Sequence, residues 1–143
     1  MTELIPFHVD AVKLNESSIR KGLSKINERE DLLLETTVDH LIEIILKNEA
    51  VLWGVFVDGV VIGLVVTLYK VNYVTNKKSV VVYLVVGIME GGQELVDTCL
   101  NVIENYAKHL ECDMIEVWGR PGWRRVLRTK DFTHRREVLI KIL

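Results

Sequence analysis

The middle of the chain is a long stretch of β-branched and aromatic residues that two polar turns divide into three segments. The segments are Val51–Val57, Val60–Val74 and Ser79–Val86. Asp58-Gly59 separates the first two, and both residues of such a pair accept the positive φ angles of a two-residue hairpin. Asn76-Lys77-Lys78 precedes the third. The pattern predicts three consecutive antiparallel strands, the last of them apolar enough for the centre of a sheet covered on both faces.

Helical periodicity flanks these strands on both sides. Before them we expect two short helices: Asn15, Ser17 or Ser18 can cap the first turn of one, and Thr36 or Thr37 that of the other. After them, Gly91-Gly92 precedes the longest helix, which carries one apolar stripe and a polar outer face. The apolar positions are Ile19, Leu23 and Ile26, then Leu41, Ile44 and Ile45, then Leu95, Cys99, Val102, Ile103, Tyr106 and Leu110.

The remaining segments complete an α/β fold, an α+β mixed sheet. We expect Phe7–Leu14 to be a first strand, Met114–Trp118 a later one, Gly122–Thr129 a short helix and Glu137–Leu143 a closing strand. The predicted order is β-α-α-β-β-β-α-β-α-β, and a meander followed by a β-α-β crossover gives a central mixed sheet with helices on both faces. Without internal repeats or linkers, residues 1–143 are predicted to form a single domain.

Composition excludes several classes of protein. The formal net charge of −2 gives the molecule no overall basic character, which argues against nucleic acid as the partner. The two cysteines, Cys99 and Cys112, lack metal-ligand spacing and indicate buried free thiols. Charges or glycines interrupt the apolar stretches before membrane-spanning length, and Met1–Asp10 has no basic segment followed by an apolar run. We expect a soluble, cytoplasmic protein that binds no membrane and no metal.

The carboxyl-terminal half resembles the GNAT acyltransferases, and in particular small GNAT-like proteins of tailed phages and prophages. The resemblance covers about residues 38–132, and it is carried by Leu52-Trp53-Gly54, Val85-Val86, Gly91-Gly92, Ile115-Glu116-Val117-Trp118-Gly119-Arg120 and Gly122-Trp123-Arg124-Arg125-Val126-Leu127. It implies the GNAT fold and transfer of an acetyl group from acetyl-CoA to a primary amine of a protein or small molecule. A phage-encoded protein of this kind is expected in the host cytoplasm or the virion.

The resemblance also implies where acetyl-CoA binds. In GNAT enzymes the pantetheine arm pairs with backbone at the end of the third meander strand, and the pyrophosphate lies on the loop and helix amino terminus that follow, where N–H groups and the helix dipole favour anions. The matching positions are Val85, Val86, Gly87, Ile88, Gly91 and Gly92. This loop usually follows a pattern in the family: a basic residue or Gln, two other residues, Gly, one other residue, then Gly or Ala. The pattern is absent here, and Glu90 directly precedes the two glycines. A plain strand-to-helix turn is the alternative interpretation.

The catalytic residues of the family have no clear counterpart. Many GNAT enzymes protonate the leaving thiolate with a Tyr four residues before a Gly-Phe pair; here Leu127 stands at the Tyr position and Asp131-Phe132 replaces Gly-Phe. Ser79–Val86 carries no carboxylate base, and its Tyr83 is expected to pack. Glu35, His40 and Glu116 could act as bases, although their sequence positions do not converge, and Glu116 is expected to be structural. A catalytically inactive GNAT-fold protein with a phage structural or host-interaction role is therefore the alternative.

A cluster of basic residues lies in and around the last predicted helix. It comprises Arg120, Arg124, Arg125, Arg128, Lys130, Arg135 and Arg136. One interpretation is a surface for an anion, which could be a CoA phosphate, an acidic protein face or nucleic acid; the other is a solvated helix face. A nucleic-acid-binding module is the weakest of the three function hypotheses. The sequence assigns neither the acyl acceptor nor the oligomeric state.

Overall fold

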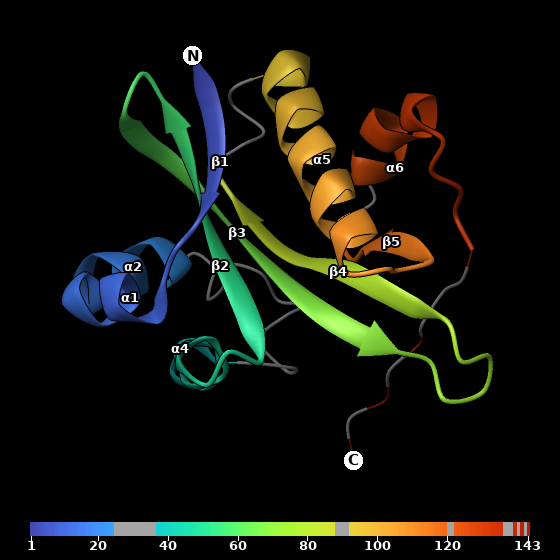
Figure 1. Ribbon diagram of the computed structural model, residues 1–143, viewed down its shortest axis with the longest axis horizontal. Coiled ribbons are helices and arrows are strands. Elements are labelled where there is room, and N and C mark those ends of the chain that lie inside the picture. Colours follow the sequence, from blue (N-terminus) through green and yellow to red (C-terminus); the bar gives the residue numbers. More distant parts are fainter. Residues whose placement is uncertain (25–36, 88–91, 120–121, 136–138, 140, 142) are drawn as a thin grey trace.

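The computed structural model of the protein describes residues 1–24, 37–87, 92–119, 122–135, 139, 141 and 143. Along them the chain forms, in order, β1 (Thr2–Pro6), α1 (Val9–Leu14), α2 (Glu16–Leu23), α4 (Val38–Leu46), β2 (Ala50–Val57), β3 (Val60–Val71), β4 (Lys78–Val86), α5 (Gly92–His109), β5 (Met114–Val117), α6 (Gly122–Leu127) and the 3-10 turn Arg128–Lys130 (Figure 1). The predicted closing strand Glu137–Leu143 falls largely outside the described residues, as do Ile26 and Glu35.

The strands form one mixed sheet in the order β1-β2-β3-β4-β5. The first four strands are antiparallel neighbours, and β4 pairs with β5 in parallel. The predicted mixed sheet is therefore confirmed. Strand β4 lies between β3 and β5, and packing on both faces of the sheet covers its side chains: Val80, Val81 and Leu84 are 1%, 0% and 2% exposed.

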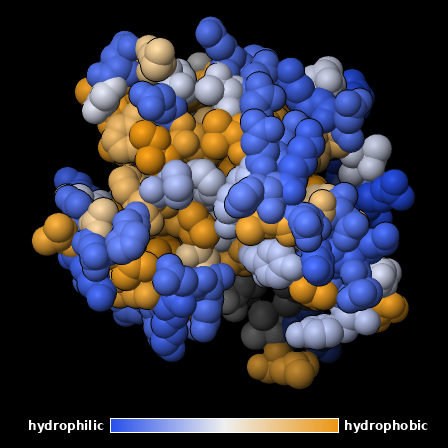
Figure 2. Space-filling view, viewed as in Figure 1, coloured by the Kyte–Doolittle hydropathy of each residue, from blue (hydrophilic) through white to orange (hydrophobic). Residues whose placement is uncertain are grey.

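Helices cover both faces of the sheet, as predicted (Figure 1). Helices α1, α2 and α4 pack on one face, around a core that includes Leu23, Leu41 and Leu84. Helices α5 and α6 pack on the other, around a core that includes Trp53 and Ile103. The apolar stripe of α5 faces the strands, and the outward side of the helix is polar, with apolar side chains visible beside it over the strands (Figure 2). No helix within the described ranges is long and apolar enough to cross a membrane.

The predicted first strand Phe7–Leu14 is wrong. The strand lies earlier, at Thr2–Pro6, and Val9–Leu14 is helix α1. The loose alternation of this segment concealed a helix start: His8 has extended backbone and its Nδ1 accepts a hydrogen bond from the Asp10 N–H, which caps the first turn. The helix is held by burial of Val12, which is fully covered.

The turn and cap predictions hold with two exceptions. Asp58 and Gly59 adopt φ of 50° and 80°, as the hairpin requires. Thr37 caps α4 by accepting from the His40 N–H. By contrast, Asn15 does not cap α2 through its side chain, because its amide donates to the Ala11 carbonyl instead. The helix predicted for Gly122–Thr129 ends at Leu127 and tightens into the 3-10 turn.

Candidate functional site

Two neighbouring strands part near the middle of the molecule. The register of β4 with β5 ends at the pair Val82–Val117, while its register with β3 continues to Val86. The Trp118 N–H still donates to the Val82 carbonyl, at 3.0 Å. The last residues of β4 therefore extend along β3 after β5 has ended, which leaves the region between β4 and the chain after β5 as the candidate site.

A β-bulge on β4 marks the same point. The register with β3 shifts between Val66 and Thr67, where Tyr83 is the additional residue on β4. Tyr83 and Leu84 both contact the core under α1, α2 and α4, whereas Val82 and Val85 contact the core under α5. Bulges re-aim side chains and bend the bulged strand, so this one contributes to the divergence of β4 from β5.

The predicted cofactor positions lie at the end of β4 and the start of α5. Val85, Val86 and Gly87 are half-buried, and Gly92 is the exposed first residue of the helix. Gly87 has φ of 83°, and a Cβ there would lie 2.4 Å from the Ile62 carbonyl oxygen, so the close approach to β3 requires glycine. The other two predicted positions, Ile88 and Gly91, lie outside the described residues.

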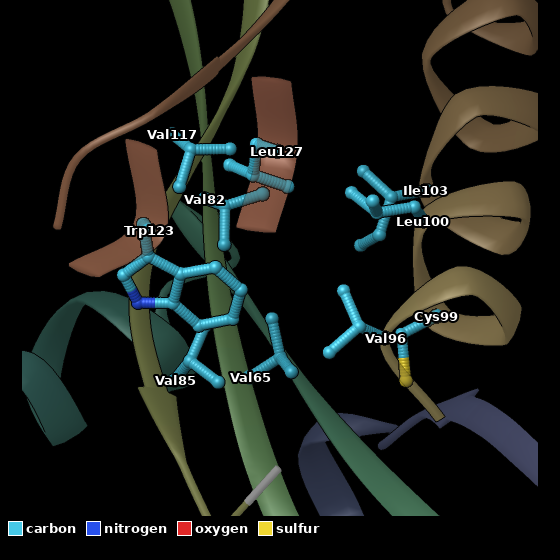
Figure 3. Close-up of a pocket in the computed structure, with 10 residues that line it drawn as sticks. All are labelled: Val65, Val82, Val85, Val96, Cys99, Leu100, Ile103, Val117, Trp123 and Leu127. Carbon is cyan, nitrogen blue, oxygen red and sulfur yellow. The ribbon is translucent and has the colours of Figure 1, made fainter. Parts of the chain in front are cut away.

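A small apolar cavity lies beneath this region, between α5, α6 and the sheet (Figure 3). Its volume is about 30 Å³, which is enough to hold a water molecule. Strands, α5 and α6 all contribute to its lining, which consists of Val65, Val82, Val85, Val96, Cys99, Leu100, Ile103, Val117, Trp123 and Leu127. Burial raises the pKa of the Cys99 thiol to about 11, so this thiol stays protonated at neutral pH.

Neither Leu127 nor Tyr83 provides a free acid or base at this end of the fold. Leu127, at the position where the resemblance would place an acidic Tyr, is 5% exposed and lines the cavity. Tyr83 is 8% exposed and packs edge-on against Trp118, with ring centroids 6.2 Å apart, as expected for a packing residue. His40 is exposed on α4, with its Nδ1 3.8 Å from Glu43.

Glu116 belongs to a polar cluster that links β3, β4 and β5. Lys70 Nζ lies 3.1 Å from Glu116 Oε2, and the Ser79 hydroxyl donates to the same oxygen at 2.7 Å. Burial alone would raise the pKa of Glu116, but the hydrogen bonds from Ser79 and Lys70 outweigh it and hold the pKa below its ordinary value. The carboxylate is therefore ionised and occupied, which supports the structural role. The sequence analysis did not single out Lys70 and Ser79. The position of a lysine within an otherwise apolar strand was the available signal that it pairs with a carboxylate.

The arginines do not all share one environment. Arg124, Arg125 and Arg128 are exposed, and none of them lies at ion-pair distance from a carboxylate within the described part of the chain. Arg124 Nη2 lies 3.3 Å from His134 Nε2. Lys130, by contrast, pairs with Asp97 at 3.1 Å. Arg120 lies outside the described residues, and no group of three or more potential metal ligands occurs among the described ones.

Comparison with known proteins supports the architecture. No family model and no curated protein sequence matches the chain. Among solved structures, ribosomal-protein-alanine N-acetyltransferase from Brucella melitensis biovar Abortus 2308 aligns with a TM-score of 0.73 over 100% of both chains, at 13% identity. An aminoglycoside N-acetyltransferase in complex with CoA aligns at 0.71 over 100% of this chain and 95% of the other, also at 13% identity.

A third neighbour is a predicted acetyltransferase with acetyl-CoA from Clostridium acetobutylicum, with a TM-score of 0.67, 19% identity and coverage of 99% of this chain and 96% of the other. Sequence identity this low establishes the fold alone. The chain has the mixed α/β fold of the GNAT acetyltransferases, and the predicted fold is thereby confirmed.

Proposed function

We propose that the protein is an N-acetyltransferase of the GNAT type, which transfers an acetyl group from acetyl-CoA to a primary amine of a small molecule or a protein. The observation that carries the proposal is the parting of β4 from β5 after Val82, beside the bulge at Tyr83. Two structural neighbours were solved with CoA or acetyl-CoA on the same fold, which supports the choice of cofactor.

The residues at this end of the fold suit a CoA thioester in part. Val85, Val86 and Gly87 offer backbone beyond the β4–β5 pairing, and Gly92 opens an 18-residue helix whose first N–H groups favour an anion. Ile88 and Gly91 complete the proposed set. By contrast, the Glu94 carboxylate in the first turn of α5 would repel an anion bound at this helix end. Acetyl-CoA, when bound, supplies the activated acyl group.

The side chains contribute mainly by position. Leu127 donates no proton and Glu116 is engaged by Lys70, so neither serves as the general acid or base. We propose that the chain contributes by positioning the amine, and that backbone N–H groups at Val86 or Gly87 polarise the thioester carbonyl. These same features favour the second candidate, a GNAT-fold protein without catalysis that serves a phage structure or contacts a host protein.

Calorimetric titration with acetyl-CoA separates the two candidates. The proposal expects saturable binding and a raised melting temperature, and Gly92→Asp should abolish both by adding negative charge at the α5 amino terminus. Gly59→Asp is the matched control, because both glycines have φ of 80° and open space around a Cβ. Absence of binding by the parent would overturn the enzyme proposal in favour of the inactive one; nucleic-acid binding that weakens steeply with salt would favour the weakest hypothesis.

A further inference from the structure

Three tryptophans differ in how they are held. Within the described part of the chain, Trp53 donates its indole N–H to Thr67 at 2.9 Å, and the Trp118 indole nitrogen lies 3.5 Å from Glu116. Trp123 has no corresponding acceptor there. Every buried side-chain nitrogen or oxygen among the described residues has a partner, so the Trp123 N–H is not buried. Its indole is held by packing, and it can move without breaking a hydrogen bond.

The Trp123 indole lies where β4 and β5 part. A Cβ on Gly119, just beyond β5, would lie 2.6 Å from Trp123 Cδ1, so the ring packs directly on that backbone. The same side chain lines the cavity together with Val85 at the end of β4 and Val117 at the end of β5. Figure 3 shows the indole on one side of the cavity and the α5 side chains on the other. The indole therefore forms the wall of the cavity at the point where the two strands part.

Behind the indole the cavity suits an aliphatic chain. Its far wall is formed by Val96, Cys99, Leu100 and Ile103 of α5, and none of its lining residues is charged. With a volume of about 30 Å³, it has no room for more than a few atoms while the indole is in place. We propose that Trp123 sets the length of the acyl chain the protein accepts: its indole restricts the site to a short acyl group, and a smaller residue at 123 would admit longer ones. This inference rests on the proposed acyl-CoA function.

The first test needs no cofactor. In a Cys112→Ser background, Cys99 is the remaining cysteine, and its rate of modification by methyl methanethiolsulfonate reports access to the cavity. Trp123→Ala should raise that rate by at least about tenfold, because the thiol is otherwise buried among apolar side chains. Trp118→Ala is the matched control: that indole packs on Tyr83, which belongs to the core on the other face of the sheet, and it does not line the cavity, so the rate should stay unchanged. Equal rates in the parent and Trp123→Ala would overturn the inference.

The second test measures affinity for acetyl-, butanoyl-, hexanoyl- and octanoyl-CoA by calorimetry. Each newly buried methylene should tighten binding by roughly fourfold, so Trp123→Ala should bind hexanoyl-CoA at least about tenfold more tightly than the parent does, with acetyl-CoA affinity nearly unchanged. Trp118→Ala should keep the parent's profile. Trp123→Leu provides a second variant should the alanine protein unfold in thermal melts.

The outcomes separate the inference from the proposed function. An unchanged chain-length profile in proteins that still bind acetyl-CoA overturns the role of Trp123 alone. Failure of every variant to bind any acyl-CoA overturns both the proposed function and the chain-length inference, even where Cys99 becomes accessible.

Discussion

The two faces of the sheet are packed differently. Under α1, α2 and α4, large side chains such as Leu23, Leu41 and Leu84 are at most 2% exposed. Under α5 and α6, a cavity lies against β3, β4 and β5 where β4 and β5 part. Close packing stabilises a fold, whereas an apolar space beside a strand gap is where a ligand can enter. The proposed function therefore assigns the acyl-CoA site to the second face and leaves the first face a supporting role.

The largest expected effect comes from truncating one leucine on each face. Leu84→Ala should lower the free energy of unfolding by about 3 kcal/mol, because it opens a new cavity in a closed core. Leu100→Ala, at the half-buried edge of the existing cavity, should cost about 1 kcal/mol. Urea unfolding measures both, and equal losses would contradict the difference between the faces.

A sharper comparison uses two adjacent valines of β3. Val65 lines the cavity and Val66 lies in the closed core, so they differ mainly in the space around them. Val66→Ile should destabilise by about 1 kcal/mol or more through overpacking. Val65→Ile should be neutral or stabilise by about 0.5 kcal/mol by filling space. Chemical denaturation of the two variants in parallel tests this; destabilisation by both would mean that the cavity cannot accept a methylene.

The cluster of Lys70, Ser79 and Glu116 predicts a pH dependence of stability. Because the folded pKa of Glu116 is lowered, its contribution is fully present above the ordinary carboxyl pKa of about 4.3 and is lost as the pH falls through the lower folded value. Glu116→Gln should therefore cost about 1 kcal/mol at neutral pH, and less as the pH falls through that value.

Unfolding free energies from about pH 6 to about pH 3 give the measurement. Glu43→Gln is the control, since Glu43 pairs with Lys47 at the exposed surface and its loss should change stability little. A difference between Glu116→Gln and the parent that stays constant across this range would refute the assigned role of the carboxylate.

The smallest effect on stability is expected for the exposed arginines. Arg124→Glu combined with Arg128→Glu should change the free energy of unfolding by less than about 0.5 kcal/mol. If the basic surface contacts a CoA phosphate, the same protein should bind acetyl-CoA more weakly, most clearly at low salt. Lys13→Glu with Lys21→Glu alters the net charge equally on the opposite face of the sheet. Equal weakening by both double variants would assign the effect to net charge alone.

Several elements could be predicted because their signal is local. Asp58-Gly59 specified a hairpin by its backbone preference, and the Thr36-Thr37 pair indicated a helix start through a side-chain oxygen, which the structure assigns to Thr37. The stripe from Leu95 to Leu110 specified the face that α5 buries. The prediction for Phe7–Leu14 failed because a short segment with few apolar residues fits both the two-residue period of a strand and the 3.6-residue period of a helix. The burial of Val12 against residues distant in the sequence decided for the helix.

The sequence by itself determined the three-strand meander, the long helix and short strand that follow it, the mixed sheet and the absence of a Tyr at position 127, because propensity, turn chemistry and side-chain identity act within a few residues. Only the tertiary structure decided where β4 leaves β5, that the Glu116 carboxylate pairs with Lys70, and that Trp123 lies on Gly119 beside an apolar cavity. These features depend on register between strands and on packing between segments far apart in the chain, which periodicity along one segment does not encode.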